Sequence, residues 1–143
     1  MALGRIVIST VAGIILLTGG VALWARSVPV PAATYHAKRD LAGPGDYPSA
    51  GGLAVMRDVA DPKAAMGDLD ARIRATRRTV PLAGSVAEGH ASYVTRSRIF
   101  GFPDVTNMWV EDGRLALSGH LVVGKSDMGV NADRLRGWLG ERP

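Results

Sequence analysis

The sequence predicts an α+β protein: a hydrophobic helix near the N-terminus, then a small antiparallel sheet of two to four strands that packs with two helices. A run of twenty uncharged residues, Ile6–Ala25, is long enough for a membrane helix. Asp112 and Gly113 join two strand-like segments, which indicates a central hairpin. Apolar residues at helical spacing stand before and after this hairpin, so they predict one helix on each side.

The hydrophobic segment predicts an uncleaved transmembrane anchor over residues 1–26. At about 1.5 Å per helical residue it spans roughly the 30 Å hydrocarbon core of a bilayer. Arg5 precedes it, Trp24 stands where interfacial aromatic residues gather, and Arg26 follows. The alternative is a cleaved signal peptide, but the apolar part of such peptides is usually about 7 to 15 residues long. Basic residues on both sides leave the orientation open.

Residues 27–52 predict an extended linker, because four prolines and several glycines disfavour regular hydrogen-bonded structure. We therefore expect the domain proper to cover 53–143. Its first helix should begin at Asp61, whose side chain can cap free amides, with Pro62 at the first helical position. The apolar stripe that follows carries this helix to about Arg78.

The second half of the domain is expected to contain the sheet and a closing helix. Segment 90–98 is rich in the β-branched and hydroxyl residues typical of strands, and 105–111 with 114–120 flank the Asp-Gly turn. Asn131 is predicted to cap the last helix, and Leu135 to lie in its buried stripe.

Composition narrows the function. The chain of 143 residues has no cysteine, which excludes disulfides, thiolate catalysis and cysteine-rich metal sites. Its 17 Lys and Arg against 13 Asp and Glu give a net charge of +4, which suits anionic headgroups as well as nucleic acid. Aromatic residues make up only 6%, so we expect no base-stacking surface and no nucleic-acid partner. His36, His90 and His120 stand apart in the sequence and predict no metal site, and we expect no cofactor.

The segment 119–126 (GHLVVGKS) matches the phosphate-binding pattern G-x-x-x-x-G-K-[ST], but its context is wrong for a nucleotide site. In such sites a parallel strand leads into the loop and a helix begins at the Lys-Ser pair. Here a hairpin precedes the loop, and the next helix is expected to start about five residues after Ser126. A nucleotide hydrolase is therefore a weak alternative.

Two stretches resemble the bacterial and plastid family called domain of unknown function 1499. They are Arg96–Asp104, with its Arg-Ser and Phe-Pro-Asp elements, and Gly124–Asn131, with Gly-x-Ser-Asp-x-Gly-x-Asn before the final helix. The resemblance covers about residues 80–139. It implies an exported domain, because many members are exported or face a thylakoid lumen. Two family features are missing: a Ser-Arg pair, which is replaced by Leu121-Val122, and an N-terminal cysteine motif.

The matching residues suggest one candidate site at the entrance to the last helix, where free amides can bind an anion. The candidate ligand-binding residues are Arg96, Arg98, Asp104, Lys125, Ser126, Asp127 and Asn131. The alternative is a structural polar network that holds the last helix on the sheet.

The sequence favours three functions in descending order. The first is a non-enzymatic, membrane-anchored accessory or assembly protein that binds a partner at the membrane surface, in the inner membrane with a periplasmic domain. The second is a domain that binds a small anion with the loop Gly124–Asn131. The third is a hydrolase, either of nucleotides or based on the carboxylates of Asp104 and Asp127, although no base has a spacing that implicates it.

Overall fold

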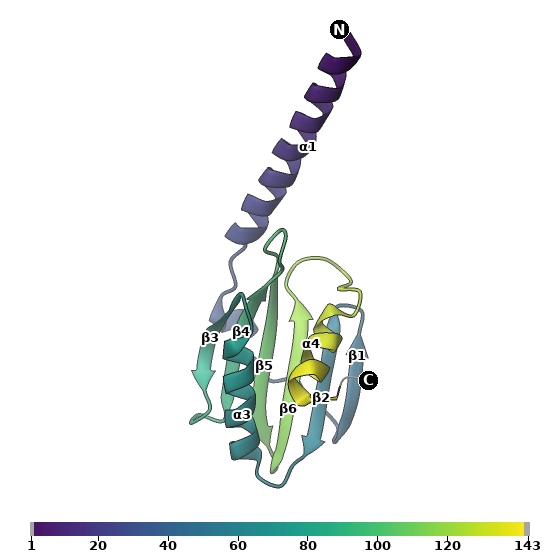
Figure 1. Ribbon diagram of the computed structural model, residues 1–143. Helices are drawn as coiled ribbons and strands as arrows, with labels where there is room; N and C mark the ends of the chain where they lie inside the picture. The colour runs from purple at the N-terminus through teal and green to yellow at the C-terminus, as the bar shows by residue number, and fades with distance from the viewer. Residues whose placement is uncertain (1, 142–143) are drawn as a thin grey trace.

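The computed structural model describes residues 2–141. One long helix, α1 (Ala2–Ser27), projects from an α+β domain that contains the rest of the chain (Figure 1). Residues Gly4–Ser27 are long and apolar enough to cross a bilayer, and nothing else in the described chain buries their apolar window. The hydrophobic segment therefore forms the single helix that its composition predicted.

The domain is built on a six-stranded antiparallel sheet with the strand order β1-β2-β6-β5-β4-β3. The strands are β1 (Gly45–Ser49), β2 (Gly52–Asp58), β3 (Thr79–Ser85), β4 (His90–Arg96), β5 (Pro103–Glu111) and β6 (Arg114–Leu121). The predicted α+β class is confirmed, although the sheet has more strands than the two to four expected.

The predicted central hairpin is β5 and β6. Asp112 and Gly113 form its turn with φ of 48° and 73°, so both residues adopt the left-handed conformation of a type I′ turn. Pairing then runs from Glu111 with Arg114 to Asp104 with Leu121. These two strands occupy the middle of the sheet, which is why the strongest local signal in the sequence lies at the centre of the fold.

Helices α3 (Pro62–Ala75) and α4 (Val130–Leu139) cover one face of the sheet (Figure 1). Asp61 accepts a hydrogen bond from the amide of Ala64 at 3.0 Å, so the predicted helix start is confirmed. The helix ends at Ala75, three residues before the predicted end. The core between helices and sheet comprises Leu53, Val55, Met66, Leu69, Ile73, Ala91, Tyr93, Met108, Leu115, Leu117, Leu135 and Trp138.

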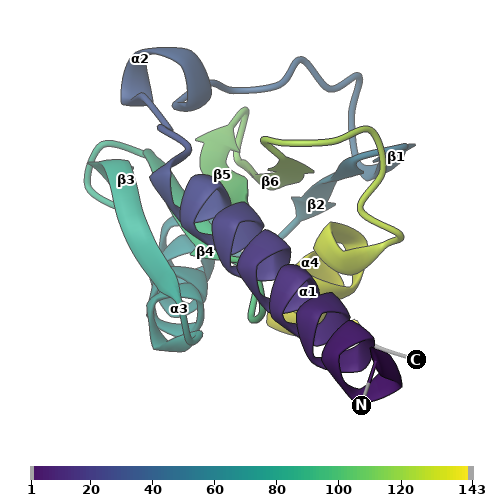
Figure 2. The same cartoon turned by 90° about the horizontal axis from the view of Figure 1, so that it is seen from above.

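The other face of the sheet is covered by the segment for which we expected an extended linker. The short helix α2 (Ala32–Tyr35) and the chain after it cross this face, on the side opposite α3 and α4 (Figure 2). Leu41 packs with Trp109 and Met56 in a second apolar cluster, and residues 45–49 pair as β1. Burial of one leucine against a tryptophan, together with strand pairing, overrides the local preference of prolines and glycines for an open chain.

Both edges of the sheet carry a proline. Pro48 lies in β1 and Pro81 in β3, where the register shifts between Pro81 and Ala83. Proline lacks the amide that a central strand needs, so it is tolerated only at an edge or bulge, where it also discourages pairing with another chain.

Candidate functional site

Three connections of the domain gather at the end of the sheet next to α1, which we call the α1-proximal end. They are residues 76–78 after α3, 97–102 between β4 and β5, and 122–129 between β6 and α4 (Figure 1). The register explains this, because Arg96 at the end of β4 pairs with Pro103 at the start of β5. Antiparallel pairing thus brings the two family-like stretches to the same end.

Arg96 joins this end of the domain to α1. Its Nη1 donates to the carbonyls of Ala25 and Gly101 at 3.1 and 3.0 Å, and its Nη2 donates to that of Val28 at 3.2 Å. One guanidinium therefore bridges the last turn of α1 and the 97–102 loop. Such charge-assisted bonds to carbonyls are stronger than neutral ones.

Arg26 makes the reciprocal connection from the helix to the loop. Its Nη1 and Nη2 donate to the carbonyls of Phe100 and Ile99, each at 3.0 Å. The ring of Trp24 meets that of Phe102 edge to face, with centroids 6.0 Å apart. The domain is therefore docked on the end of the helix.

Gly101 makes this close approach possible. Its φ is +83°, and a Cβ at this position would stand 2.6 Å from Cγ of Arg26. Ser97 Oγ accepts from the amides of Gly101 and Phe102 at 3.1 and 3.0 Å, which closes the loop on itself. The Arg-Ser and Phe-Pro-Asp elements of the sequence thus build the junction.

Two adjoining cavities lie beside the junction. One has a volume of about 510 Å³ between the end of α3, the 97–102 loop and the start of α4. The other, of about 460 Å³, is lined by Arg26, Val80 and Gly101 together with four residues that both cavities share. The shared residues are Arg78, Arg96, Ser97 and Arg98. We call the pair the arginine cavity.

The arginine cavity is strongly positive. Its larger part is lined by Arg77, Arg78, Arg96, Arg98 and Arg134. Asp104 is the sole carboxylate there. It lies 3.1 Å from Nη1 of Arg134. Burial raises the pKa of Asp104, and the neighbouring guanidinium of Arg134 opposes that shift. Net positive charge therefore remains in the cavity.

The arginine side chains of the cavity differ in how many hydrogen bonds and ion pairs they form. Arg78 donates from Nε to the carbonyl of Arg96 at 3.1 Å. Among residues 2–141, Arg77 and Arg98 form neither a hydrogen bond nor an ion pair, and both are exposed. These two guanidinium groups, and the terminal nitrogens of Arg78, remain available to a ligand.

The seven candidate residues from the sequence fall into two groups. Arg96, Arg98 and Asp104 line the arginine cavity, whereas Lys125, Ser126, Asp127 and Asn131 do not. Arg77, Arg78 and Arg134 also line it and were not selected as candidates. Arg77 and Arg78 directly follow the end of α3, whereas Arg134 lies in α4, so only the first two belong to a basic stretch that is visible in the sequence.

The loop before α4 satisfies its own amides. The carboxylate of Asp127 accepts from the amides of Gly129 and Asn131 at 3.0 and 2.8 Å, and Ser126 Oγ accepts from that of Met128 at 3.3 Å. Burial of Asp127 opposes ionisation, but these bonds outweigh it and lower the pKa. The loop has the geometry of a structural network.

The prediction that Asn131 caps the last helix is wrong. The helix starts one residue earlier, at Val130, after Gly129 in a left-handed conformation, and Asp127 binds the free amides instead. Asn131 is fully buried, and its Oδ1 accepts from Arg134 Nη1 at 2.7 Å. This bond connects the start of α4 to the wall of the arginine cavity.

The match to the phosphate-binding pattern has no phosphate-binding geometry. Gly119 to Leu121 end strand β6, and α4 begins at Val130, four residues after Ser126. No helix N-terminus stands at Lys125 and Ser126, as that motif requires.

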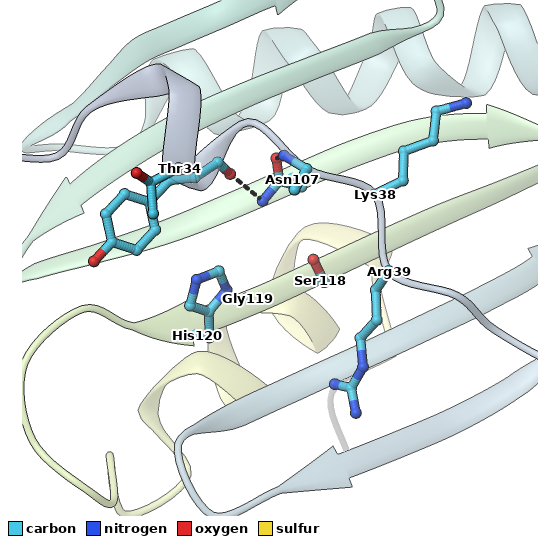
Figure 3. Close-up of a pocket in the computed structure, with 9 residues that line it drawn as sticks. Thr34, Lys38, Arg39, Asn107, Ser118, Gly119 and His120 are labelled. Carbon is cyan, nitrogen blue, oxygen red and sulfur yellow. Dashed lines mark hydrogen bonds between the residues drawn. The ribbon is translucent and has the colours of Figure 1, made fainter.

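A second cavity of about 350 Å³ lies on the face of the sheet that α2 covers (Figure 3). Asn107 is its organising residue: its Nδ2 donates to the carbonyl of Tyr35 at 3.0 Å, and its Oδ1 accepts from the amide of Ala37 at 3.2 Å. Lys38 and Arg39 belong to the chain that crosses the sheet, and their side chains point away from one another (Figure 3).

The structure brings together two histidines that the sequence left apart. The rings of His36 and His90 stack with centroids 3.8 Å apart, and Nδ1 of His36 lies 2.6 Å from Ser92 Oγ. Burial lowers the pKa of His90, and His36 adds to this shift. Ser92 is 1% exposed and donates to Asn107 Oδ1, so it is unsuited to attack a substrate.

Within residues 2–141, no three His, Asp or Glu side chains lie close enough together to hold a metal ion. The bonds of Asn107 to Tyr35 and Ala37 fasten the covering segment to the sheet.

The comparison with known families gives one match. The model of the family described as protein of unknown function (DUF1499) matches residues 34–141. This confirms the resemblance seen in the sequence and extends it from about residue 80 back to α2. Neither a curated protein nor a solved structure matches the chain. Because the family model covers well over half of the 143 residues, this protein belongs to the DUF1499 family.

Proposed function

We propose that this protein is a single-pass membrane-anchored, non-enzymatic accessory or assembly protein whose domain binds a partner at the bilayer surface. The observation that carries the proposal is the junction: Arg96 and Arg26 bind the 97–102 loop and the end of α1 to one another. A domain docked in this way stays at a constant height above the membrane.

The surface of α1 supports the anchoring. Leu16, Leu17 and Leu23 are 77%, 70% and 73% exposed. A helix that is apolar all round needs an apolar environment, which a bilayer supplies. We further propose that the membrane is the inner membrane and that the domain is periplasmic, as the family resemblance implies.

Anchoring is tested by alkaline carbonate extraction of membranes that contain the full chain. We expect the protein to stay in the pellet. Leu16→Arg should shift it to the supernatant, because arginine at the centre of a membrane helix costs about 3 kcal/mol. Leu16→Ala is the matched control and should stay in the pellet. Extraction of the unmodified chain, or a mass that lacks the first 25 residues, would contradict anchoring.

Orientation is tested with a single cysteine, since the natural chain has none. Asp68 is exposed on α3, so Asp68→Cys offers one reactive thiol in the domain. We expect a membrane-impermeant maleimide to label it once the outer membrane is opened. Labelling only after the inner membrane is lysed would place the domain in the cytoplasm.

Partner binding is tested by native sizing after extraction in a mild detergent. We expect the full chain to migrate in an assembly larger than one 15.0 kDa chain with its micelle. A strictly monomeric, partner-free species would count against an accessory or assembly role.

A further inference from the structure

We propose that the arginine cavity binds the phosphate group of an anionic glycerophospholipid from the leaflet in which α1 ends. This inference rests on the proposed anchoring, because the cavity is otherwise not at a bilayer. It assigns to the membrane-facing end of the domain a ligand class and a binding site.

The position of the cavity follows from its bonds to the helix. Arg26 comes directly after the apolar segment, so it lies at the bilayer interface when that segment spans the hydrocarbon core. Arg26 also lines the smaller part of the cavity, and Arg96, which lines both parts, binds the carbonyls of Ala25 and Val28. The cavity is thus held at the height of the lipid headgroups.

The chemistry of the walls suits a phosphate oxyanion. A guanidinium presents paired N–H donors that match phosphate oxygens in a bidentate geometry. The guanidinium groups of Arg77 and Arg98 form no hydrogen bond or ion pair in the described chain, and Arg78 donates only from Nε. Free N–H donors therefore line the cavity both at the end of α3 and in the 97–102 loop. The single carboxylate, Asp104, is held by Arg134.

The backbone at Arg78 supports a role for its side chain. Its φ is +62°, a left-handed conformation that favours glycine or asparagine and strains a residue with a Cβ. The structure nevertheless places an arginine there, with its side chain in both parts of the cavity. The strain is explained if the guanidinium is needed at this place.

An apolar tip stands beside the basic walls. Ile99 is 72% exposed in the loop that Arg26 holds, next to Arg98 and Phe100. An exposed isoleucine adjoining arginines fits the interface of a bilayer, where apolar side chains enter the acyl region and basic groups remain among phosphates. A soluble phosphate ester makes no use of this tip, which is why the lipid is the favoured source of the phosphate.

The test measures lipid retained by the full chain. The chain is purified in mild detergent with equal amounts of phosphatidylglycerol and phosphatidylcholine, and bound lipids are counted by native mass spectrometry. We expect preferential retention of phosphatidylglycerol. Arg77→Gln with Arg98→Gln should weaken it about 25-fold, at roughly five-fold for each arginine near an anionic headgroup.

Two further variants separate the site from general charge and from folding. Lys63→Gln with Arg114→Gln removes the same charge at the opposite end of the domain, where Arg114 forms only an exposed ion pair with Asp58, and retention should not change. Arg78→Gly relieves the left-handed strain, so its melting temperature should stay near that of the unmodified chain while retention falls.

Each outcome decides a separate point. Equal weakening by the distal pair, or equal retention of the two lipids, overturns the lipid site while carbonate resistance still supports the anchor. Binding of inorganic phosphate to the cavity with full displacement of phosphatidylglycerol identifies a free phosphate as the ligand and overturns the lipid source. Loss of carbonate resistance in the unmodified chain refutes the anchoring and with it this inference.

Discussion

Removal of the Asn107 side chain should release the segment that covers the second face of the sheet. Asn107 is 1% exposed on β5 and holds this segment by two bonds, to the carbonyl of Tyr35 and from the amide of Ala37. Asn107→Ala deletes both bonds and leaves the apolar contact of Leu41 with Trp109 in place. The expected effect is therefore local opening of the segment, with the sheet intact.

The size of the effect follows from the bonds lost. Each hydrogen bond contributes a net of about 1 kcal/mol, so two contribute about 2 kcal/mol. Since 1.4 kcal/mol is a factor of ten in an equilibrium, the open state should become roughly 30-fold more populated. The bond that Asn107 Oδ1 accepts from Ser92 Oγ lies on the sheet itself and adds to global stability only.

Limited proteolysis measures this opening at one place. Lys38 and Arg39 are exposed trypsin sites within the covering segment. Cleavage tracks the population of the open form when closing is faster than cutting, so the rate at these two sites should rise roughly 30-fold in Asn107→Ala. Mass spectrometry separates these cuts from cleavage elsewhere in the full chain.

A control variant on the same face tests whether the bonds matter. Ser118 lines the same cavity and, within residues 2–141, makes no hydrogen bond to the segment. Ser118→Ala should leave cleavage at Lys38 and Arg39 unchanged. If Asn107→Ala is cut no faster than the control, Asn107 does not hold the segment, and the account of this face is refuted.

Three other predictions concern the junction, the loop before α4 and the stacked histidines. Gly101→Ala should lower the free energy of unfolding by about 1–2 kcal/mol through its positive φ and the clash with Arg26, and Arg26→Ala in the same chain should relieve the clash and leave the strain. Asp127→Ala should cost about 1 kcal/mol at neutral pH. Because the pKa of Asp127 is lowered in the folded protein, its carboxylate stabilises the fold above pH 3.8 and loses this effect as the pH falls through the folded pKa. The melting temperatures of Asp127→Ala and of the unmodified chain should therefore converge at low pH. A difference that stays constant with pH would contradict this. The pKa of His90 is lowered in the folded protein, so the unfolded chain takes up the proton first as the pH drops. Stability should therefore fall as the pH drops below 6.5 through the folded pKa. His90→Gln should flatten this part of a plot of melting temperature against pH.

The parts of the fold that depend on neighbouring residues were predictable from the sequence. Asp61 with Pro62 marked a helix start, and Asp112 with Gly113 marked a hairpin, because the physical need there involves only neighbouring residues. The edge strands were missed, since Pro48 and Pro81 are unfavourable in strands on average and acceptable only at an edge. Whether a strand lies at an edge is decided by the whole sheet.

For the candidate site, the sequence predicted which segments meet and not which residues bind one another. The segments 96–104 and 124–131 were chosen together, and antiparallel pairing does bring both to the α1-proximal end. The role of each residue depended on partners far away in the sequence. Arg96 binds carbonyls about seventy residues earlier, and Arg134 takes up Asp104 thirty residues away. The spacing of residues within either segment does not predict such long-range pairs.

The sequence by itself determined the α+β class, the apolar helix at the N-terminus and the family, because each depends on a continuous stretch of chain: twenty uncharged residues, a turn dipeptide, or a short motif. Only the tertiary structure decided what covers the second face of the sheet and where the charges meet. Packing of Leu41 on Trp109 converts a proline-rich stretch into part of the domain. Hydrogen bonds from Arg26 and Arg96 then set the domain on the end of the helix and surround one cavity with arginines that the chain supplies from four separate places.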